Sequence, residues 1–182
     1  MIRTLPRAIA LLCFAAAFSA AAQANAPAAG PAPLTNRLST LKLSEQLRAQ
    51  GIAGRRSICG KILRIFPNGI LVESGYTNLL RAPLTRSWLV PGGVVASRAQ
   101  NLVESKEPGA LCVGTVFLTD LPKRGKPRQY DYVIIAGYPT GEFTYTSVGT
   151  VKKTVRRFSA NLDQAVQENL AAAQAVPSQT AR

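Results

Sequence analysis

The feature that most constrains the fold is a hairpin signal in the first half of the chain. Residues 58–66 read ICGKILRIF, a run rich in β-branched and aromatic residues, and residues 67–69 (PNG) supply a strong turn. The strand pattern resumes at once in ILVESGY, residues 70–76. The first strand is apolar on both faces, so another element must cover its outer face. The helices expected on either side of the strands are the candidates.

Further short strands follow this hairpin. They are expected at residues 93–98, 110–120 and 130–138, with a last hairpin over residues 141–158. Residues 77–92 contain two prolines and the only tryptophan, and they are expected to form a packed, irregular connection. The spacing predicts a mainly β fold, a small five- or six-stranded barrel of the OB or SH3-like kind spanning about residues 57–158.

One helix is expected before the barrel and one after it. Residues 36–50 carry a leucine stripe and end at Gly51, a glycine suited to a helix C-cap, although Ser44 offers an alternative start for a shorter helix. A second apolar stripe begins at Leu162, with either Ser159 or Asn161 as its N-cap. We therefore expect a single domain with flanking helices over residues 36–174, followed by a disordered polar tail at 175–182.

The N-terminal residues resemble a secretory signal. Arg3 and Arg7 precede an apolar run over residues 8–22, and Ala22-Gln-Ala24 fits the small-residue cleavage rule, which predicts a signal peptide at 1–24. The alternative is a lipoprotein acylated at Cys13, but Leu12 occupies the position where such signals need a small residue. We expect a periplasmic or secreted protein without a transmembrane anchor after cleavage. Residues 25–35, rich in Ala, Pro and Gly, are expected to form a flexible leader.

The chain is strongly basic, with 22 Lys and Arg against nine Asp and Glu, a net charge of +13. Without Arg3 and Arg7 the net charge is +11, which favours acidic partners such as nucleic acid, anionic glycans or lipid headgroups. The densest cluster, Lys123, Arg124, Lys126 and Arg128, lies on a loop expected at residues 121–129. Such a loop resembles the loops of nucleic-acid-binding barrels that contact the phosphate backbone. The alternative is a solvated loop that keeps strand edges from associating.

The hairpin at residues 141–158, GEFTYTSVGTVKKTVRRF, places cations on both of its faces. Lys153 and Arg157 share the side of the valines, so we expect the hairpin to lie at a barrel edge or to contain a bulge near Lys153. Lys152 and Arg156 point to the opposite side and are predicted to extend the basic loop into one polyanion-binding face.

Three tyrosines are candidates for stacking beside that face: Tyr130, Tyr132 and Tyr145. The alternative is that these rings belong to the core or to cross-strand pairs.

Cys59 and Cys112 are the cysteines that remain after processing, and they allow one disulfide. In an OB fold the first and fourth strands are neighbours, and the two cysteines lie on the first and fourth strands expected here. The alternative is two buried thiols on different strands.

Little in the sequence points to catalysis. The chain has no histidine, and its nearest acidic pair, Glu104 and Glu107, lies on a loop that we expect to be solvated. Ser39 and Lys42 match S-x-x-K, but the companion motifs of penicillin-recognising enzymes are absent. We predict no catalytic residue, no cofactor and no metal site.

The segments CGKILRIFPNGILVESG and GEFTYTSVGTVKKTVRRF, at the two ends of residues 59–158, resemble a group of small secreted bacterial proteins of unknown function. The resemblance implies an exported small β-barrel and supplies no activity. We therefore expect an exported, non-enzymatic binding or structural module of the cell envelope, with an envelope protein or an anionic polymer as its partner. The alternatives are a single-stranded nucleic-acid-binding, OB-like barrel and, less favoured, a redox or hydrolytic enzyme using the cysteines.

Overall fold

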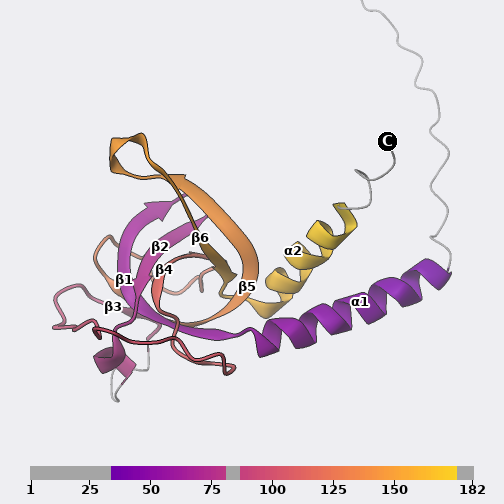
Figure 1. Ribbon diagram of the computed structural model, residues 1–182, viewed down its shortest axis with the longest axis horizontal. Coiled ribbons are helices and arrows are strands. Elements are labelled where there is room, and N and C mark those ends of the chain that lie inside the picture. The colour runs from indigo at the N-terminus through magenta and orange to yellow at the C-terminus, as the bar shows by residue number, and fades with distance from the viewer. Residues whose placement is uncertain (1–33, 81–86, 176–182) are drawn as a thin grey trace, which may run out of the picture. The chain divides into compact units, whose positions relative to one another are not determined.

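Six strands form one mixed sheet in the computed structural model, which describes residues 34–80 and 87–175 (Figure 1). The elements in chain order are α1 (Leu34–Ala53), β1 (Arg56–Phe66), β2 (Gly69–Ser74), a 3-10 turn (Thr77–Leu80), β3 (Leu89–Val90), β4 (Gly114–Thr119), β5 (Tyr132–Thr146), a 3-10 turn (Val148–Thr150), β6 (Lys152–Ser159) and α2 (Leu162–Ala175). The predicted signal peptide, residues 25–33 of the predicted leader, and residues 176–182 of the predicted tail lie outside the described residues.

The strand pairings close five of the strands, β1, β2, β4, β6 and β5, into a ring. The neighbours follow the order β1-β2-β4-β6-β5, and β5 pairs again with β1, while the short β3 adds to β5. All of these pairs are antiparallel except β4 and β6. The prediction of a mainly β protein with a helix at each end is confirmed.

Alternation along the strands directs one set of apolar side chains into the ring. These buried residues form the main core: Ile58, Ile62, Ile70, Val72, Cys112, Val116, Leu118, Val133 and Phe158. The hairpin predicted from the PNG turn is present, with Phe66 opposite Gly69 and a register shift between Ile62 and Arg64.

A second cluster covers the outer face of β1, and it does not come from the helices. Cys59 packs there with Tyr76, Leu79, Val90 and Tyr132. Tyr76 and Leu79 belong to the connection after β2, Val90 to β3, and Tyr132 to β5. The prediction that the flanking helices cover this face is therefore wrong. The pairing of β3 with β5 holds the connection beside β1 and completes the burial.

The helices pack against each other and against β5 and β6. α1 continues through Gly51, where an added Cβ would lie 3.2 Å from the Leu162 Cδ1 atom, so this glycine permits the close approach of α2 and is not a C-cap. Arg48 and Asp163 bridge the helices at 2.7 Å. Of the two predicted N-caps for α2, Asn161 is confirmed, because its Oδ1 atom accepts the N–H of Asp163 at 2.9 Å. None of the described helices is long and apolar enough to cross a membrane.

Several strand boundaries differ from the predictions. Residues 93–98 form no strand, and β4 begins at Gly114 instead of residue 110. β5 continues through Pro139 and Gly141, where the predicted strand and hairpin were separate, because both residues pair with β6 and the register shift between them leaves only Thr140 without a partner. Gly141 has φ +107°, a conformation that glycine adopts without strain.

The last hairpin extends past the ring as a two-stranded ribbon (Figure 1). β4 pairs with β6 from Arg156 to Ser159, so residues 152–155 pair with β5 alone. Lys153 is exposed on this ribbon, while Arg157 is half-buried and forms a 2.6 Å ion pair with Glu168 of α2. The irregularity lies in β5 at Pro139, and not near Lys153.

Candidate functional site

The predicted basic loop joins β4 to β5 and carries four exposed cations, Lys123, Arg124, Lys126 and Arg128. In the described part of the chain no carboxylate lies within ion-pair distance of any of them. Their positive charges are therefore open to an external partner.

The backbone of this loop is held in place although its side chains reach solvent. The indole Nε1 of Trp88 donates to the carbonyl of Arg124 at 2.5 Å. The carboxylate of Asp131 accepts the N–H of Arg128 at 3.1 Å. A loop fixed by such contacts presents its charges at lower entropic cost than a free loop does.

Tyr130 ends the loop in an unusual conformation. Its φ angle is +72°, in the left-handed region that bulky residues rarely occupy, and its N–H donates to the Ile62 carbonyl at 2.9 Å. An added Cβ at Gly92 would lie 2.6 Å from the Tyr130 carbonyl oxygen, so glycine there permits this approach. The residue is 55% exposed, and the Lys61 Nζ atom lies 4.9 Å from the ring centroid. Tyr130 thus presents an aromatic ring to solvent beside a cation.

The other two stacking candidates have different surroundings. Tyr132 is 7% exposed and packs edge-on against Tyr76, with ring centroids 5.3 Å apart. Its ring belongs to the core, so the prediction that Tyr132 offers a stacking surface is wrong. Tyr145 is half-buried on the ribbon and stacks on Phe143 at a centroid distance of 6.5 Å.

Tyr145 ends an aromatic cluster on the outside of the ring. Phe117 and Phe143 stack at 3.7 Å, and Phe66 meets both of them edge-on. Arg64 covers Phe66 from 4.9 Å, and its Nη1 atom donates to the Thr146 carbonyl at 3.3 Å. These contacts join the ribbon to the end of β1 and bring the exposed Arg64 next to the ribbon that carries Lys152.

Arg156 is not part of an open basic face. Its two Nη atoms donate to the two carboxylate oxygens of Glu104, each at 2.8 Å, and Arg56 Nε reaches the same carboxylate at 3.2 Å. The hydrogen bond from Arg156 holds the pKa of Glu104 down at about 2, against the opposing effect of burial and with help from the Val113 N–H. The prediction that this loop is solvated is wrong for Glu104, whose side chain is 20% exposed.

The two cysteines are free and buried, so the predicted candidate disulfide between Cys59 and Cys112 is absent. Cys59 lies in the outer cluster, where its Sγ donates to the Tyr76 carbonyl at 2.9 Å, whereas Cys112 lies in the main core. Burial raises the pKa of each thiol to about 11. Both sulfurs are therefore held as thiols at neutral pH, as in the alternative of two buried thiols.

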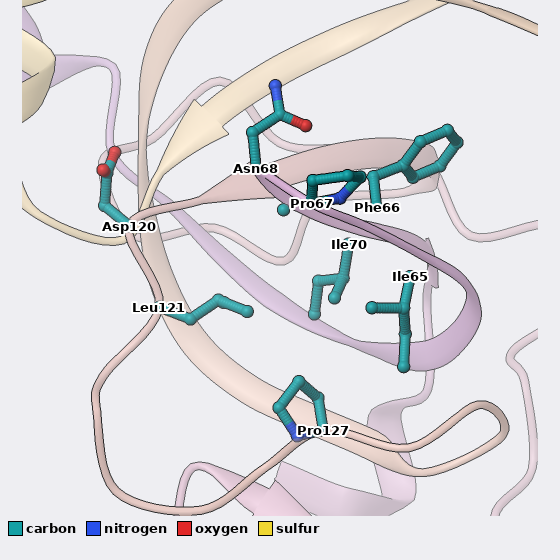
Figure 2. Close-up of a pocket in the computed structure, with 9 residues that line it drawn as sticks. Ile65, Phe66, Pro67, Asn68, Ile70, Asp120, Leu121 and Pro127 are labelled. Carbon is teal, nitrogen blue, oxygen red and sulfur yellow. The ribbon is translucent and has the colours of Figure 1, made fainter. Parts of the chain in front are cut away.

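A hollow of about 280 Å³ lies between the β1–β2 turn and the basic loop (Figure 2). Ile65, Ile70, Leu121 and Pro127 line it, with Asp120 at its margin. The Asp120 carboxylate accepts hydrogen bonds from the hydroxyls of Thr119 and Ser159 at 2.8 and 2.7 Å. The hollow can accept a small apolar group, and its one acid is already bound to neighbouring hydroxyls.

Within the described residues, no three acidic or cysteine side chains converge as a metal site would require. The acids that make close contacts bind arginines, hydroxyls or backbone N–H groups of this chain. The groups left exposed near the basic loop are its cations and the ring of Tyr130, which can contact anions and planar groups.

The predictions from the sequence missed Lys61 and Arg64. Both lie on β1, next to Tyr130 and to the ribbon respectively. The available signal was their position, since these two cations interrupt the run at residues 58–66, which is otherwise apolar.

Comparison with known proteins gives no match: no family model, no curated protein and no solved structure is significantly similar to this chain.

Proposed function

We propose that this protein is an exported, non-enzymatic module of the cell envelope that binds an anionic polymer through a basic surface. The basic surface consists of the exposed cations of the β4–β5 loop and of the β5–β6 ribbon. Its members are Lys123, Arg124, Lys126, Arg128, Lys152 and Lys153. Relative to the sequence-based prediction, Lys153 takes the place of Arg156, because Glu104 binds Arg156.

The observation that carries the proposal is the concentration of cations without an ion pair on one anchored loop, where residues 123–128 carry four of them. Five arginines form ion pairs within the chain: Arg48, Arg56, Arg98, Arg156 and Arg157. The six cations of the basic surface have no such partner among the described residues. Uncompensated charge on an anchored loop attracts polyanions by releasing their counterions.

The proposal includes the fold type and the location. The strand order supports a barrel of the OB type, because the first strand of the ring pairs with the fourth and the third runs parallel to the fifth. The basic, apolar and small-residue pattern of residues 1–24 supports export. The use of the half-buried Glu104 in ion pairs and of the cysteines in the core supports a binding role over catalysis.

Binding of inorganic polyphosphate at increasing salt tests the proposal, since this probe carries charge without rings or sugars. We expect the affinity to fall with salt, and the slope to decrease by about 0.7 for each cation removed, as for single-stranded polyanions. The double variant Lys123→Gln/Lys126→Gln removes two charges from the basic surface. Lys42→Gln/Lys106→Gln removes two exposed charges elsewhere and is the matched control. Equal effects of the two variants, or affinity that does not change with salt, would contradict the proposal.

A further inference from the structure

We propose that Tyr130, Lys61 and Arg64 form a base-stacking site, and that the anionic polymer is a single-stranded nucleic acid. The inference rests on the proposed function, because the basic surface would bind the phosphates of the same strand. It adds the chemical class of the ligand and three residues outside that surface.

The first observation is the environment of the Tyr130 ring. The Lys61 ammonium lies 4.9 Å from its centroid, within the range of a cation–π contact, and the residue is still 55% exposed. A large part of the ring is therefore available to a second planar group. A base that stacks there would lie within reach of a cation able to neutralise its own phosphate.

The second observation is that the chain holds Tyr130 in a strained conformation. A φ of +72° costs free energy for a residue with a Cβ, and several contacts maintain it. The Tyr130 N–H is bonded to Ile62, and the next residue, Asp131, accepts N–H groups from both Gly92 and Arg128 at 3.1 Å. The core does not bury this ring, so the conformation that these backbone contacts maintain leaves the ring available to a ligand.

The third observation is that two cations of β1 share one face. Lys61 is opposite Glu73 and Arg64 is opposite Leu71, and residues two apart on β2 point to the same side. The register shift between Ile62 and Arg64 is what brings the two cations to this common face. Lys61 contacts Tyr130 at the end of the basic loop, and Arg64 contacts the ribbon, so β1 connects the two parts of the basic surface.

Single-stranded nucleic acid fits this pattern better than other polyanions. It alternates a charged group with a flat, polarisable ring, and each ring can stack on an exposed tyrosine whatever the base. Polyphosphate carries the charge without any ring, so it would use the cations and gain nothing from Tyr130.

The test compares oligo(dT) with an abasic oligodeoxynucleotide of equal length, which has the same phosphates and no bases. We expect the folded protein to bind oligo(dT) about tenfold more tightly, the gain of a stacked base. Tyr130→Gly should remove this difference and leave abasic binding unchanged, whereas Tyr130→Phe should retain it. Lys61→Gln should weaken binding of both oligomers. Because glycine tolerates positive φ, Tyr130→Gly is expected to remain folded, and its thermal midpoint checks this.

Each outcome has a distinct meaning. If wild type binds the two oligomers equally, or if Tyr130→Gly changes neither, the stacking site is refuted while polyanion binding stands. If polyphosphate binds and oligo(dT) does not, the ligand class is wrong. If none of the three probes binds, the proposed function fails together with this inference.

Discussion

Substitution of Glu104 by Gln tests the ion-pair network that Glu104 forms with Arg56 and Arg156. Glu104 comes from the long connection before β4, and it joins Arg56 at the start of β1 to Arg156 on β6. The glutamine side chain would keep an acceptor for the Val113 N–H but would lose the charge that both arginines share. We expect the connection to loosen and the protein to become less stable.

The size of the effect follows from the pKa of Glu104. A shift from 4.5 to about 2 corresponds to about 3 kcal/mol of stabilisation, at about 1.4 kcal/mol for each pH unit. Because the Arg156 side chain is 47% exposed, water screens part of this, and we expect a loss of about 2 kcal/mol at pH 7. The folded pKa lies below the unfolded one, so the stabilisation is complete above pH 4.5 and disappears as the pH falls toward 2.

Urea unfolding followed by the fluorescence of Trp88 measures this loss at pH 7 and at pH 3. The difference in unfolding free energy between wild type and Glu104→Gln should be about 2 kcal/mol at pH 7 and clearly smaller at pH 3. Glu107→Gln is the matched control, because Glu107 is exposed and its carboxylate forms no ion pair within the described chain. Equal losses for the two variants, or a loss for Glu104→Gln that is independent of pH, would refute the reasoning.

Three further predictions concern the backbone and the thiols. Tyr130→Gly should raise the unfolding free energy by up to about 1 kcal/mol, because glycine relieves the positive φ, and a lower thermal midpoint would contradict this. Gly60→Ala should prevent stable folding, since the new Cβ would lie 2.3 Å from the Glu73 carbonyl oxygen, and native circular dichroism and urea stability in this variant would disprove the close approach. Cys59 and Cys112 should react with a thiol reagent only after denaturation, because burial raises both pKa values to about 11, and fast labelling of the native protein would refute their burial.

The parts of the fold that the sequence predicts are those set by neighbouring residues. The hairpin around the PNG turn depends on local alternation and turn chemistry, and it is present. The break expected near Pro139 is absent: proline and glycine often end strands, but here both pair with β6 across a bulge at Thr140. Local patterns give no information on such compensation by a partner strand.

In the candidate site, too, the sequence predicts what neighbouring residues determine and misses what distant residues determine. Alternation places Tyr130 and Tyr132 on one face, yet one is exposed and the other is in the core, because Tyr130 precedes the strand with positive φ and breaks the alternation. The bond between Arg156 and Glu104 joins residues 52 positions apart, and nothing local in the sequence indicates it. The sequence could therefore identify the cations but not their partners.

The two acids that flank the basic loop explain why its four cations have no ion-pair partner nearby in the sequence. Asp120 and Asp131 bracket the loop cations, but the first accepts two hydroxyls and the second accepts two backbone N–H groups. Neither carboxylate forms an ion pair with Lys123 or Lys126. The acids nearest in sequence thus contact hydroxyls and the backbone, and they leave the loop cations without an ion pair in the described chain. On the proposed function, this arrangement is what leaves the loop charge uncompensated for a polyanion.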